Sequence, residues 1–575
     1  KTKAIPFQKE TDGDTDMTTD LTAFCEPRGI AVIGASSHIR AIGGQPIQHL
    51  RENGYAGRIY PVNGKYAELH GLPCYASVLQ VPDPVDLAII AVKAELVPSL
   101  MAECGERGIR HAIIFSAGFK ETGTAGEKLE RQIREAAARS GVRFLGPNCQ
   151  GVMNIPSRVY AGFGDVFEAR PFRAGPISMV TQSGGFGYSV VNVAQELGVG
   201  FNRIFSTGNE ADLTTEDILE YLIEDAQTEI ISAYVEGLKH PGRLVELGRR
   251  ALEARKPLLI WKVGRSEQGS KAAASHTGSM AGNKQYYDAA IARAGMLPVD
   301  DVYDLVDFSA VYGQRKLPAG NRMGIVTISG GAGVLVSDKC EEWGLDVPAL
   351  SESTRLKLAK VIPAFASSMN PIDVTAQIFN DPSLLRQALE ITLDDENIDM
   401  LMIVNANMHK ELGRQVAQEI ASIAARTRKP VAVSWSARDH LNKEGFDLLR
   451  DSAVPIFKTP GRGVRALYLL SRYSESLRRL REARTYPTIP LQARQEAARI
   501  LSGLKRVPTE YETRRILSLY GIPVPDESMV SSAEEAVKAA RRIGFPVVLK
   551  VMSSELLHKT EAGAVQVGIR NAEEL

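Results

Sequence analysis

The sequence predicts an α/β protein with several doubly wound domains, and three observations support this fold class. A chain of 575 residues is too long for one core, since a domain usually holds about 100–200 residues, so we expect roughly three to five domains. From about residue 29 onward, short apolar runs alternate with helical runs that carry charged faces, as in βαβ units around a parallel sheet. One glycine-rich turn between strand and helix signals occurs twice, at 180–187 and 326–333, which predicts a repeated unit.

The composition excludes several classes of protein. Hydrophobic residues make up 44% and charged residues 24% of the chain, and Lys+Arg equals Asp+Glu at 68 each. No basic excess indicates nucleic acid, and no polybasic tract indicates an anionic membrane. The five cysteines are widely spaced without C-x-x-C, so we expect a reducing cytoplasm and neither a disulfide framework nor a zinc site. No apolar run reaches the roughly 18–20 residues of a membrane span, and the polar segment 1–21 is expected to be a disordered lead-in.

The first two domains are predicted from strand-like runs that end in polar turns. The first domain, 22–148, has such runs at 29–35, 86–92, 111–117 and 142–146. The second, 149–318, has them at 177–182, 201–207, 230–237 and 257–264. Because charged helical runs such as 125–141 separate the strands, we expect a parallel sheet covered on both faces.

The remaining sequence divides into three parts. A third domain of the same kind is predicted at 319–475, with strands at 323–329, 400–406 and 431–435. Residues 476–504 are charged, contain prolines and are predicted to form a linker helix. A different unit begins near 505, with a strand at 545–552 and a turn-rich segment at 558–569, and we interpret it as the beginning of an incomplete domain.

The repeated turn has the pattern Ser-Gly-Gly-x-Gly. Its two copies agree at six of eight positions, and each ends a strand and opens a helix. The free N–H groups and the dipole of a helix N-terminus attract anions, and glycine lets the backbone approach them closely. One such turn is equally compatible with an ordinary strand-to-helix turn, but two copies favour a shared phosphate site. The predicted phosphate-binding residues are Ser183, Gly184, Gly185, Ser329, Gly330, Gly331, Ala332 and Gly333.

His276 lies among small residues in the loop KAAASHTGS, beyond the strand at 257–264. Ligands of open α/β sheets bind beyond the carboxyl ends of the strands, and a neutral imidazole can accept a phosphoryl group. We therefore predict that His276 carries phosphate, the alternative being a surface histidine without a catalytic role. Glu236, at the end of the preceding strand, is predicted to hold the other ring nitrogen, although an ordinary strand-end glutamate fits equally well.

Loops at the strand ends of the first domain suit a nucleotide with phosphates, such as coenzyme A. They supply small residues and a cation, although structural glycine turns without a ligand are the alternative. The candidate residues are Gly34, Ala35, Ser36, Ser37, Asn63, Lys65, Ser116, Ala117, Gly118 and Phe119. In the last unit, Lys550 lies in the apolar run FPVVLKVM. A lysine there needs an anion, which could be an ATP phosphate or a carboxylate.

The order of these units and motifs resembles the single-chain, ADP-forming acetyl-CoA synthetases, which are NDP-forming acyl-CoA ligases related to succinyl-CoA synthetase. The resemblance covers about 22–575 and rests on VIGASS, SAGF, GPNCQG, TQSGG, STGNEAD, YVEG, SHTGS, TISGGAG, NPIDVT and LKVMSSELLHKTEAG. It implies a CoA-binding Rossmann-like domain, a flavodoxin-like ligase domain carrying a phosphohistidine, a second flavodoxin-like ligase domain and the start of an ATP-grasp domain.

The resemblance also implies roles for individual residues. His276 in SHTGS matches the phosphorylated histidine, Glu236 in YVEG matches the glutamate that supports it, and the two glycine-rich helix starts match the helices that flank the phosphohistidine. The CoA-binding edge matches VIGASS, SAGF, Asn63–Lys65 and, in addition, Val92 and Lys93. In the ATP-grasp part, Lys550 matches a nucleotide-binding lysine. His558 matches a second histidine proposed to relay the phosphoryl group, although EAGAV replaces the Gly-Gly pair of many relatives.

The activity implied by the resemblance is the reversible reaction of ATP, a carboxylic acid and CoA to acyl-CoA, ADP and phosphate, through an acyl phosphate and a phosphohistidine. Its cofactors would be coenzyme A, ATP/ADP and Mg²⁺, and the acyl pocket is expected near Asn148 in GPNCQG and Asn209 in STGNEAD. Acetate, other short acids and aromatic acids such as hydroxycinnamates all remain open. We also expect a cytoplasmic homo-oligomer, a dimer, that binds small molecules and neither nucleic acid nor membrane.

Two alternative functions share parts of this pattern. A citrate-cleaving CoA lyase has the same phosphohistidine core but needs a citrate-synthase-like region, which the motifs do not include. A CoA-responsive regulatory protein, or a protein acetyltransferase-type relative, would have a non-catalytic ligase core. The intact His276 and both glycine-rich turns argue against that degeneration. ADP release that depends on CoA and acid would distinguish the enzyme from the regulator.

Overall fold

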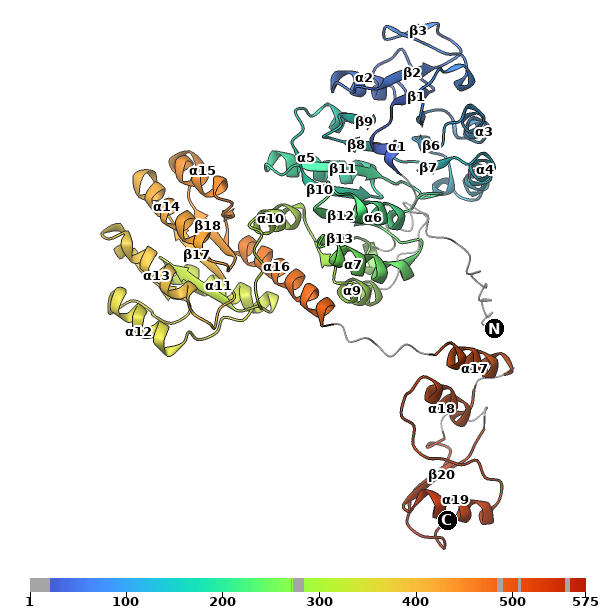
Figure 1. The fold of residues 1–575 in the computed structure, drawn as a ribbon, viewed down its shortest axis with the longest axis vertical. Coiled ribbons are helices and arrows are strands. Elements are labelled where there is room, and N and C mark those ends of the chain that lie inside the picture. The colour runs from blue at the N-terminus through green and yellow to red at the C-terminus, as the bar shows by residue number, and fades with distance from the viewer. Residues whose placement is uncertain (1–20, 270, 272–283, 483–489, 505–507, 554–558) are drawn as a thin grey trace. The chain divides into compact units, whose positions relative to one another are not determined.

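The computed structural model describes residues 21–269, 271, 284–482, 490–504, 508–553 and 559–575. The chain forms two compact units, Lys1–Glu482 and Ala483–Leu575, and we describe each by itself. The first unit contains three main sheets, each with helices against it (Figure 1). Parallel pairing dominates these sheets, so the predicted α/β class is confirmed.

The first sheet is wholly parallel and has the order β2-β1-β5-β6-β7. Every residue of β1 and β5 is buried, as expected for apolar strands covered on both faces. In α4 the buried residues Ile133, Ala136 and Ala137 recur at helical spacing, so one apolar stripe faces the sheet. The elements are α1 (Thr22–Cys25), β1 (Gly29–Ile33), α2 (Gln45–Glu52), β2 (Arg58–Val62), β3 (Glu68–Leu69), β4 (Leu72–Pro73), β5 (Leu87–Ile90), α3 (Val97–Arg107), β6 (His111–Ile114), α4 (Thr124–Ser140) and β7 (Arg143–Leu145).

The second sheet has the order β14-β13-β12-β10-β11-β8-β9. Five of its strands are parallel, and the antiparallel hairpin β8–β9 extends the sheet beside β11. The sequence patterns did not predict this hairpin, because each of its strands has only four residues and all of them are buried. The elements are β8 (Gly151–Asn154), β9 (Val159–Gly162), β10 (Ala174–Thr181), α5 (Gly184–Glu196), β11 (Phe201–Ser206), α6 (Thr215–Glu224), β12 (Ile230–Val235), α7 (Leu244–Glu253), β13 (Leu258–Lys262), α9 (Lys284–Arg293), β14 (Leu297–Pro298) and α10 (Val302–Tyr312).

The third sheet is parallel with the order β16-β15-β17-β18-β19. Numbered along the chain, its strands follow the order 2-1-3-4-5, which is also the order of the first sheet and of β10 to β14 in the second. The elements are β15 (Met323–Thr327), α11 (Gly330–Trp343), α12 (Glu352–Val361), β16 (Ile372–Asp373), α13 (Ser383–Leu393), β17 (Met400–Ala406), α14 (Lys410–Arg426), β18 (Val431–Ser436), α15 (Lys443–Asp451), β19 (Ile456–Phe457) and α16 (Pro460–Arg481).

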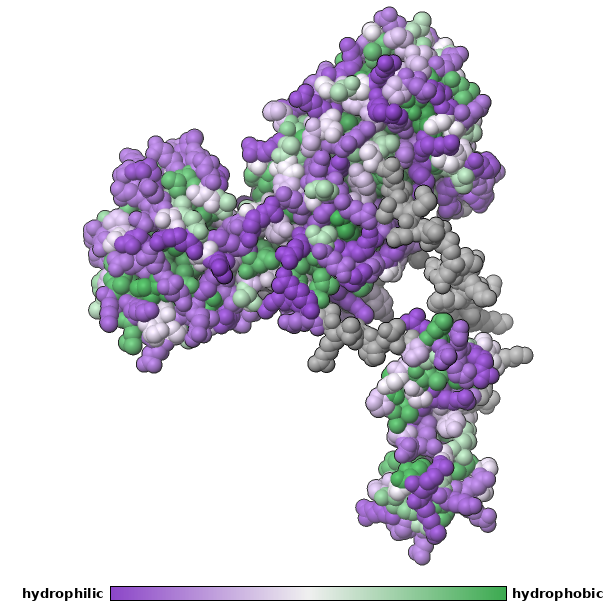
Figure 2. Space-filling model, in the orientation of Figure 1, coloured by the Kyte–Doolittle hydropathy of each residue, from purple (hydrophilic) through white to green (hydrophobic). Residues whose placement is uncertain are grey.

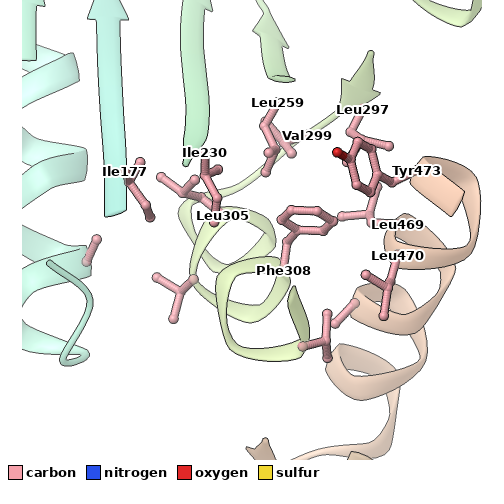
Figure 3. Close-up of a cluster of buried hydrophobic side chains, with 14 of the residues drawn as sticks. Ile177, Ile230, Leu259, Leu297, Val299, Leu305, Phe308, Leu469, Leu470 and Tyr473 are labelled. Atoms are coloured by element: carbon pink, nitrogen blue, oxygen red, sulfur yellow. The ribbon is translucent and has the colours of Figure 1, made fainter. Parts of the chain in front are cut away.

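Continuous apolar cores connect the three sheets of the first unit. One core contains buried residues of both the first and the second sheet, including Ile30 and Val180. Another joins the second and third sheets through α10 and α16, whose side chains Phe308 and Leu469 lie in one cluster with strand residues (Figure 3). Burying such side chains contributes about 1.5–3 kcal/mol each, so we expect α10 and α16 to hold the second and third sheets together.

The second unit contains three described helices and a two-stranded antiparallel sheet. Thr509 and Glu512 form a capping box at the start of α18. Within the described residues of both units, no helix is long and apolar enough to cross a membrane. Figure 2 shows mainly hydrophilic side chains on the visible face, with apolar ones in small separate groups. The elements are α17 (Leu491–Ser502), α18 (Glu510–Leu519), α19 (Ala533–Ile543), β20 (Val547–Lys550) and β21 (Val565–Ile569).

Candidate functional site

The strand order 2-1-3-4-5 creates the same ligand-binding geometry in all three sheets of the first unit. Connections leave in opposite directions from the first and third strands, which opens a crevice at their carboxyl ends. These pairs are β1 and β5, β10 and β12, and β15 and β17. The strands at or beside these crevices are followed by the predicted site residues, namely the CoA residues, both glycine-rich turns and Glu236.

The candidate CoA loops lie at the carboxyl ends of four neighbouring strands, β2, β1, β5 and β6. The Asn63 amide donates to the Ala35 carbonyl at 2.8 Å, which joins the loops after β2 and β1. The Ser116 hydroxyl donates to the Val92 carbonyl at 2.6 Å, which joins those after β6 and β5. Gly34 has a φ of +85°, and an added Cβ would collide with the Ala91 carbonyl, so this glycine is needed for close packing of the strand ends.

Lys65 and Lys93 are both exposed at this edge. They follow β2 and β5, on either side of the loop after β1. Exposed ammonium groups flanking a loop of small residues suit a ligand with several phosphates. The edge thus offers backbone groups at its centre and positive charge at its flanks.

The two glycine-rich turns have the same local structure. Thr181 Oγ1 donates to the Ser183 carbonyl at 2.8 Å, and Thr327 Oγ1 donates to the Ser329 carbonyl at 2.9 Å. Ser183 and Ser329 are the N-cap residues of α5 and α11, and neither hydroxyl makes a capping hydrogen bond. Among the described residues, the N–H groups of the first two glycines of each helix therefore remain available for an anion. The N–H groups of Ala332 and Gly333, in contrast, donate to the Ser329 carbonyl at 3.0 and 3.1 Å.

The glycines within each turn differ in surroundings. A Cβ added to Gly185 or Gly331 would meet no atom within 4 Å, so both face open space. A Cβ added to Gly187 would collide with the Thr181 side chain, and one on Gly333 would lie 3.1 Å from Pro371 Cβ. The second glycine of each turn thus leaves room for a ligand, whereas the last allows the helix to pack closely. No hydrogen bond or ion pair between described residues joins the two turns.

The GPNCQG loop lies against the first glycine-rich turn. A Cβ added to Gly184 would lie 2.7 Å from Gln150 Cβ. Gln150 fixes this loop through two hydrogen bonds. The Gln150 backbone N–H donates to Ser206 Oγ at 3.1 Å, and the Gln150 side-chain amide donates to the Phe163 carbonyl at 2.7 Å. The predicted acyl motifs GPNCQG and STGNEAD therefore meet beside the helix start at Ser183.

Asn148 and Asn209, the predicted acyl-pocket residues, contact each other. Asn148 Nδ2 donates to Asn209 Oδ1 at 3.4 Å. Asn209 is only 6% exposed, and its Nδ2 donates to Glu121 Oε2 at 2.5 Å and to Glu130 Oε2 at 3.3 Å. Asn148 is exposed, with a φ of +58°. Asn148 thus keeps an accessible side chain, whereas the amide of Asn209 is occupied by interior partners.

Glu121 connects this amide pair to the CoA edge, a role that the sequence analysis did not assign. Its Oε1 accepts from the Gly118 N–H at 2.6 Å and the Phe119 N–H at 3.1 Å. Burial raises the pKa of Glu121, but hydrogen bonds from Asn209 and from the turn outweigh it and hold this pKa below its usual value. An acidic residue two positions after the SAGF turn was the only sequence signal for this contact.

Glu236 directly follows β12, beside the first glycine-rich turn. The side chain is 8% exposed, and Oε2 has no hydrogen-bond partner among the described residues. Lys262, at the end of β13, is 2% exposed and its Nζ donates to the Glu236 carbonyl at 2.8 Å. Burial lowers the pKa of Lys262 to about 8. His276 lies outside the described residues, so its orientation by Glu236 stays a prediction.

In the second unit, Lys550 contacts a carboxylate. Its Nζ lies 2.7 Å from Glu510 Oε1, and Lys559 Nζ lies 3.3 Å from the other oxygen. A carboxylate, one of the two anions considered from the sequence, thus lies beside Lys550, and ATP binding by Lys550 stays a prediction. These side chains line a cavity of about 580 Å³ together with Thr509 and Thr560. His558 lies outside the described residues, and no group of three or more His, Cys, Asp or Glu among the residues described could hold a metal.

Comparison with known families accounts for most of the chain. Residues 28–155 match a family described as a CoA binding domain, and 174–312 match a succinyl-CoA ligase like flavodoxin domain. Residues 323–473 match a ligase-CoA domain, and 499–575 match an ATP-grasp domain. The predicted Rossmann-like CoA-binding, flavodoxin-like and ATP-grasp components of the fold are confirmed.

Individual relatives extend over almost the whole sequence. The chain is 36% identical to acetate–CoA ligase [ADP-forming] I of Archaeoglobus fulgidus, across 94% of this chain and 77% of that protein. It is 31% identical to 4-hydroxybutyrate–CoA ligase [ADP-forming] of Nitrosopumilus maritimus, across 96% and 78%. The structure of dinucleotide forming acetyl-coenzyme A synthetase 1 of Ca. Korarchaeum cryptofilum, in complex with phosphate and ADP, matches with a TM-score of 0.72 and 31% identity, across 81% and 99%. These similarities show that the chain belongs to the family of ADP-forming acid–CoA ligases.

Proposed function

We propose that this ligase joins a carboxylic acid to CoA through an acyl phosphate and a phosphohistidine at His276. One observation supports this most strongly: the predicted CoA, acyl and phosphate groups form a continuous edge of hydrogen-bonded or packed residues. It runs from the Gly118 turn through Glu121 and Asn209 to Asn148, and continues along the same loop through Gln150 to Gly184. Positioning of reactants along one such edge favours successive transfer reactions.

The reaction is simplest to follow from acyl-CoA. A phosphate oxygen attacks the thioester carbonyl carbon, the C–S bond breaks, and the CoA thiolate leaves. A nitrogen of His276 then attacks the phosphorus of the acyl phosphate, the P–O bond to the acyl group breaks, and the carboxylate leaves. In the relay proposed below, a nitrogen of His558 attacks this phosphorus and the P–N bond to His276 breaks. Finally an oxygen of the ADP β-phosphate attacks the phosphorus, the P–N bond to the histidine breaks, and ATP is formed.

The steps before transfer to ADP use groups in or near the carboxyl-edge crevices. The N–H groups of α5 and α11 would stabilise the phosphoryl oxygens, because they are uncapped and point along the helix dipole. The Asn148 amide would donate to the acyl oxygen. The unpartnered Oε2 of Glu236 would accept the second ring N–H of His276 and stabilise the phosphorylated imidazole.

The nucleotide is proposed to bind in the second unit, near Lys550, with His558 as a second phosphoryl acceptor. Lys550 and Lys559 share Glu510 in the present structure, and polyphosphate could replace that carboxylate as their partner. The resemblance implies magnesium, but the described residues do not supply a set of ligands for it. We therefore assign no step to a protein-held metal.

The acid is proposed to be a short or aromatic carboxylic acid. The relatives named above act on acetate and 4-hydroxybutyrate, and the exposed Asn148 can donate to any acyl oxygen. A panel of acetate, 4-hydroxybutyrate and ferulate with ATP, magnesium and CoA would identify the class through ADP release. The predicted homodimer stays a prediction that sedimentation velocity would test.

The proposed phosphohistidine is tested by labelling the full chain. Acetyl-CoA, or the acyl-CoA of the best acid in the panel, is incubated with labelled phosphate, and phosphopeptides are located by mass spectrometry. The label should be acid-labile, base-stable and located on His276, and it should be absent from His276→Ala. Full labelling and turnover of His276→Ala would refute the carrier role. A wild type that shows no ADP release dependent on CoA and acid would favour a non-catalytic CoA-responsive protein.

A further inference from the structure

The Gln182 side chain connects the first glycine-rich turn to the strand that carries Glu236. Its backbone N–H donates to the Tyr234 carbonyl at 3.2 Å, which continues the β10–β12 ladder by one residue. Its side-chain Oε1 accepts from the Glu236 N–H at 2.6 Å and from the Gly237 N–H at 3.0 Å. Its Nε2 donates to the Gly237 carbonyl at 2.5 Å. The amide of Gln182 thus pairs with the end of β12 as a further peptide group would.

These contacts hold the backbone of Glu236 while leaving the carboxylate oxygen Oε2 without a partner. Gln182 occupies the N–H of Glu236, and the Lys262 ammonium occupies its carbonyl at 2.8 Å. The backbone therefore has partners on both sides, whereas Oε2 is buried without one among the described residues. A buried acceptor without a partner is unfavourable by about 1–3 kcal/mol, so Oε2 would gain free energy by accepting a hydrogen bond from another group, such as a histidine ring.

Gln182 is itself positioned from the opposite side. Its Nε2 also donates to Thr215 Oγ1 at 3.3 Å, and Thr215 Oγ1 donates to Glu210 Oε1 at 2.5 Å. Burial raises the pKa of the Glu210 carboxyl. Glu210 follows Asn209 in the STGNEAD motif. The Gln182 amide therefore joins the Glu236 backbone to the loop that also contains the acyl-pocket asparagine.

We propose that Gln182 is a positioning residue for phosphohistidine formation, which acts by fixing Glu236 relative to the phosphate-binding turn at Ser183. This inference rests on the proposed function, because it presumes that Glu236 supports the phosphorylated His276. Gln182 precedes Ser183 directly, so one residue sets both the helix start that binds the phosphoryl oxygens and the carboxylate that orients the imidazole. Groups that orient a reactive side chain need to be held closely, since small displacements reduce the rate strongly.

The test compares Gln182→Met, Glu236→Gln and the double variant in the full chain. Methionine has a similar length but forms none of the four side-chain hydrogen bonds. For Gln182→Met we expect kcat and the rate of His276 phosphorylation from acyl-CoA and phosphate to fall about 10–100-fold, the range known for partners of metal ligands. The KM for CoA should stay within about twofold, because the hydrogen bonds of the Gln182 side chain lie within the second-sheet region. If Gln182 acts through Glu236, the double variant should be less than about twofold slower than Glu236→Gln alone.

Thr228→Val is the matched control. Thr228 lies at the amino end of β12, is 1% exposed, and its Oγ1 bonds to Ser178 Oγ at 2.7 Å and Asp225 Oδ2 at 2.5 Å. This variant loses a buried hydrogen bond to Ser178 of β10 and another to Asp225 after α6, at the end of β12 away from Glu236, so it should keep the wild-type kcat. If circular dichroism shows that Gln182→Met does not fold, Gln182→Glu takes its place in the comparison. A glutamate oxygen can still accept from the Glu236 and Gly237 N–H groups.

Three outcomes would overturn the role of Gln182. They are a wild-type rate in the Gln182 variant, losses that multiply in the double variant, or an equal loss in Thr228→Val. A wild-type protein that forms neither ADP nor phosphohistidine would instead refute the proposed function, so the two failures can be distinguished.

Discussion

Substitution of two nearby glycines in α5, Gly185 and Gly187, should separate phosphate binding from folding. The helix begins at Gly184, so Gly185 and Gly187 both lie in its first turn. A side chain at Gly185 would enter open space above the helix N-terminus, whereas one at Gly187 would collide with Thr181. We therefore expect Gly185→Val to impair phosphate binding with little change in stability, and Gly187→Val to destabilise the protein.

The magnitudes follow from these surroundings. Loss of one hydrogen bond to a charged ligand weakens binding by about 1.5–3 kcal/mol, so the phosphate concentration for half-maximal rate should rise about 10–150-fold in Gly185→Val. Its unfolding free energy should change by less than about 0.5 kcal/mol, since a Cβ at this position meets no atom within 4 Å. Gly187→Val should lose about 1–3 kcal/mol of unfolding free energy through overpacking.

The assay measures ATP formation from acyl-CoA and ADP as a function of phosphate concentration, together with thermal unfolding of each variant. Gly331→Val provides the matched substitution in α11, where an added Cβ also meets open space. If both turns hold one phosphoryl group, it should raise the phosphate requirement as Gly185→Val does. A folded Gly185→Val protein with an unchanged phosphate dependence would refute the binding role of the first turn.

Three further predictions concern Glu236, the buried Lys262 and the second unit. Glu236→Gln should lower kcat about 10–100-fold with an unchanged KM for CoA, and wild-type turnover in that variant would contradict its role in orienting His276. Because burial lowers the pKa of Lys262 to about 8 from 10.5, the unfolded chain binds more protons between these values. The unfolding free energy of wild type relative to Lys262→Met should therefore rise from pH 8 to 10.5, and a fall measured by denaturant titration would contradict the shift. A chain of residues 1–482 should be phosphorylated on His276 by acyl-CoA and phosphate but not by ATP, whereas labelling by ATP in mass spectrometry would place the nucleotide elsewhere.

The α/β class and the two glycine-rich turns could be predicted from local patterns. Strands such as β1 and β5 are buried along their whole length, so they appear as continuous apolar runs. The turns at Ser183 and Ser329 were visible because glycine and serine at fixed positions open a helix after a strand. The hairpin β8–β9 was not predicted, because four-residue buried strands have no distinctive periodicity.

The contacts within the site could not be predicted from the sequence, because they join residues far apart in the chain. Glu121 and Asn209 are 88 residues apart, and Gln182 and Glu236 are 54 apart. Nothing in a single sequence indicates that such residues meet, since the strand order that joins them depends on how the sheets form.

The sequence by itself therefore determined the types of element, the repeated turn, the motif residues and the family they resemble, because each is encoded by neighbouring residues. Only the tertiary structure decided which strand ends lie together, that the Asn209 amide is occupied by interior carboxylates, and that Glu236 Oε2 is buried without a described partner. The physical reason is that hydrogen bonding and burial depend on distances between segments, which are set by the packing of three sheets around shared cores.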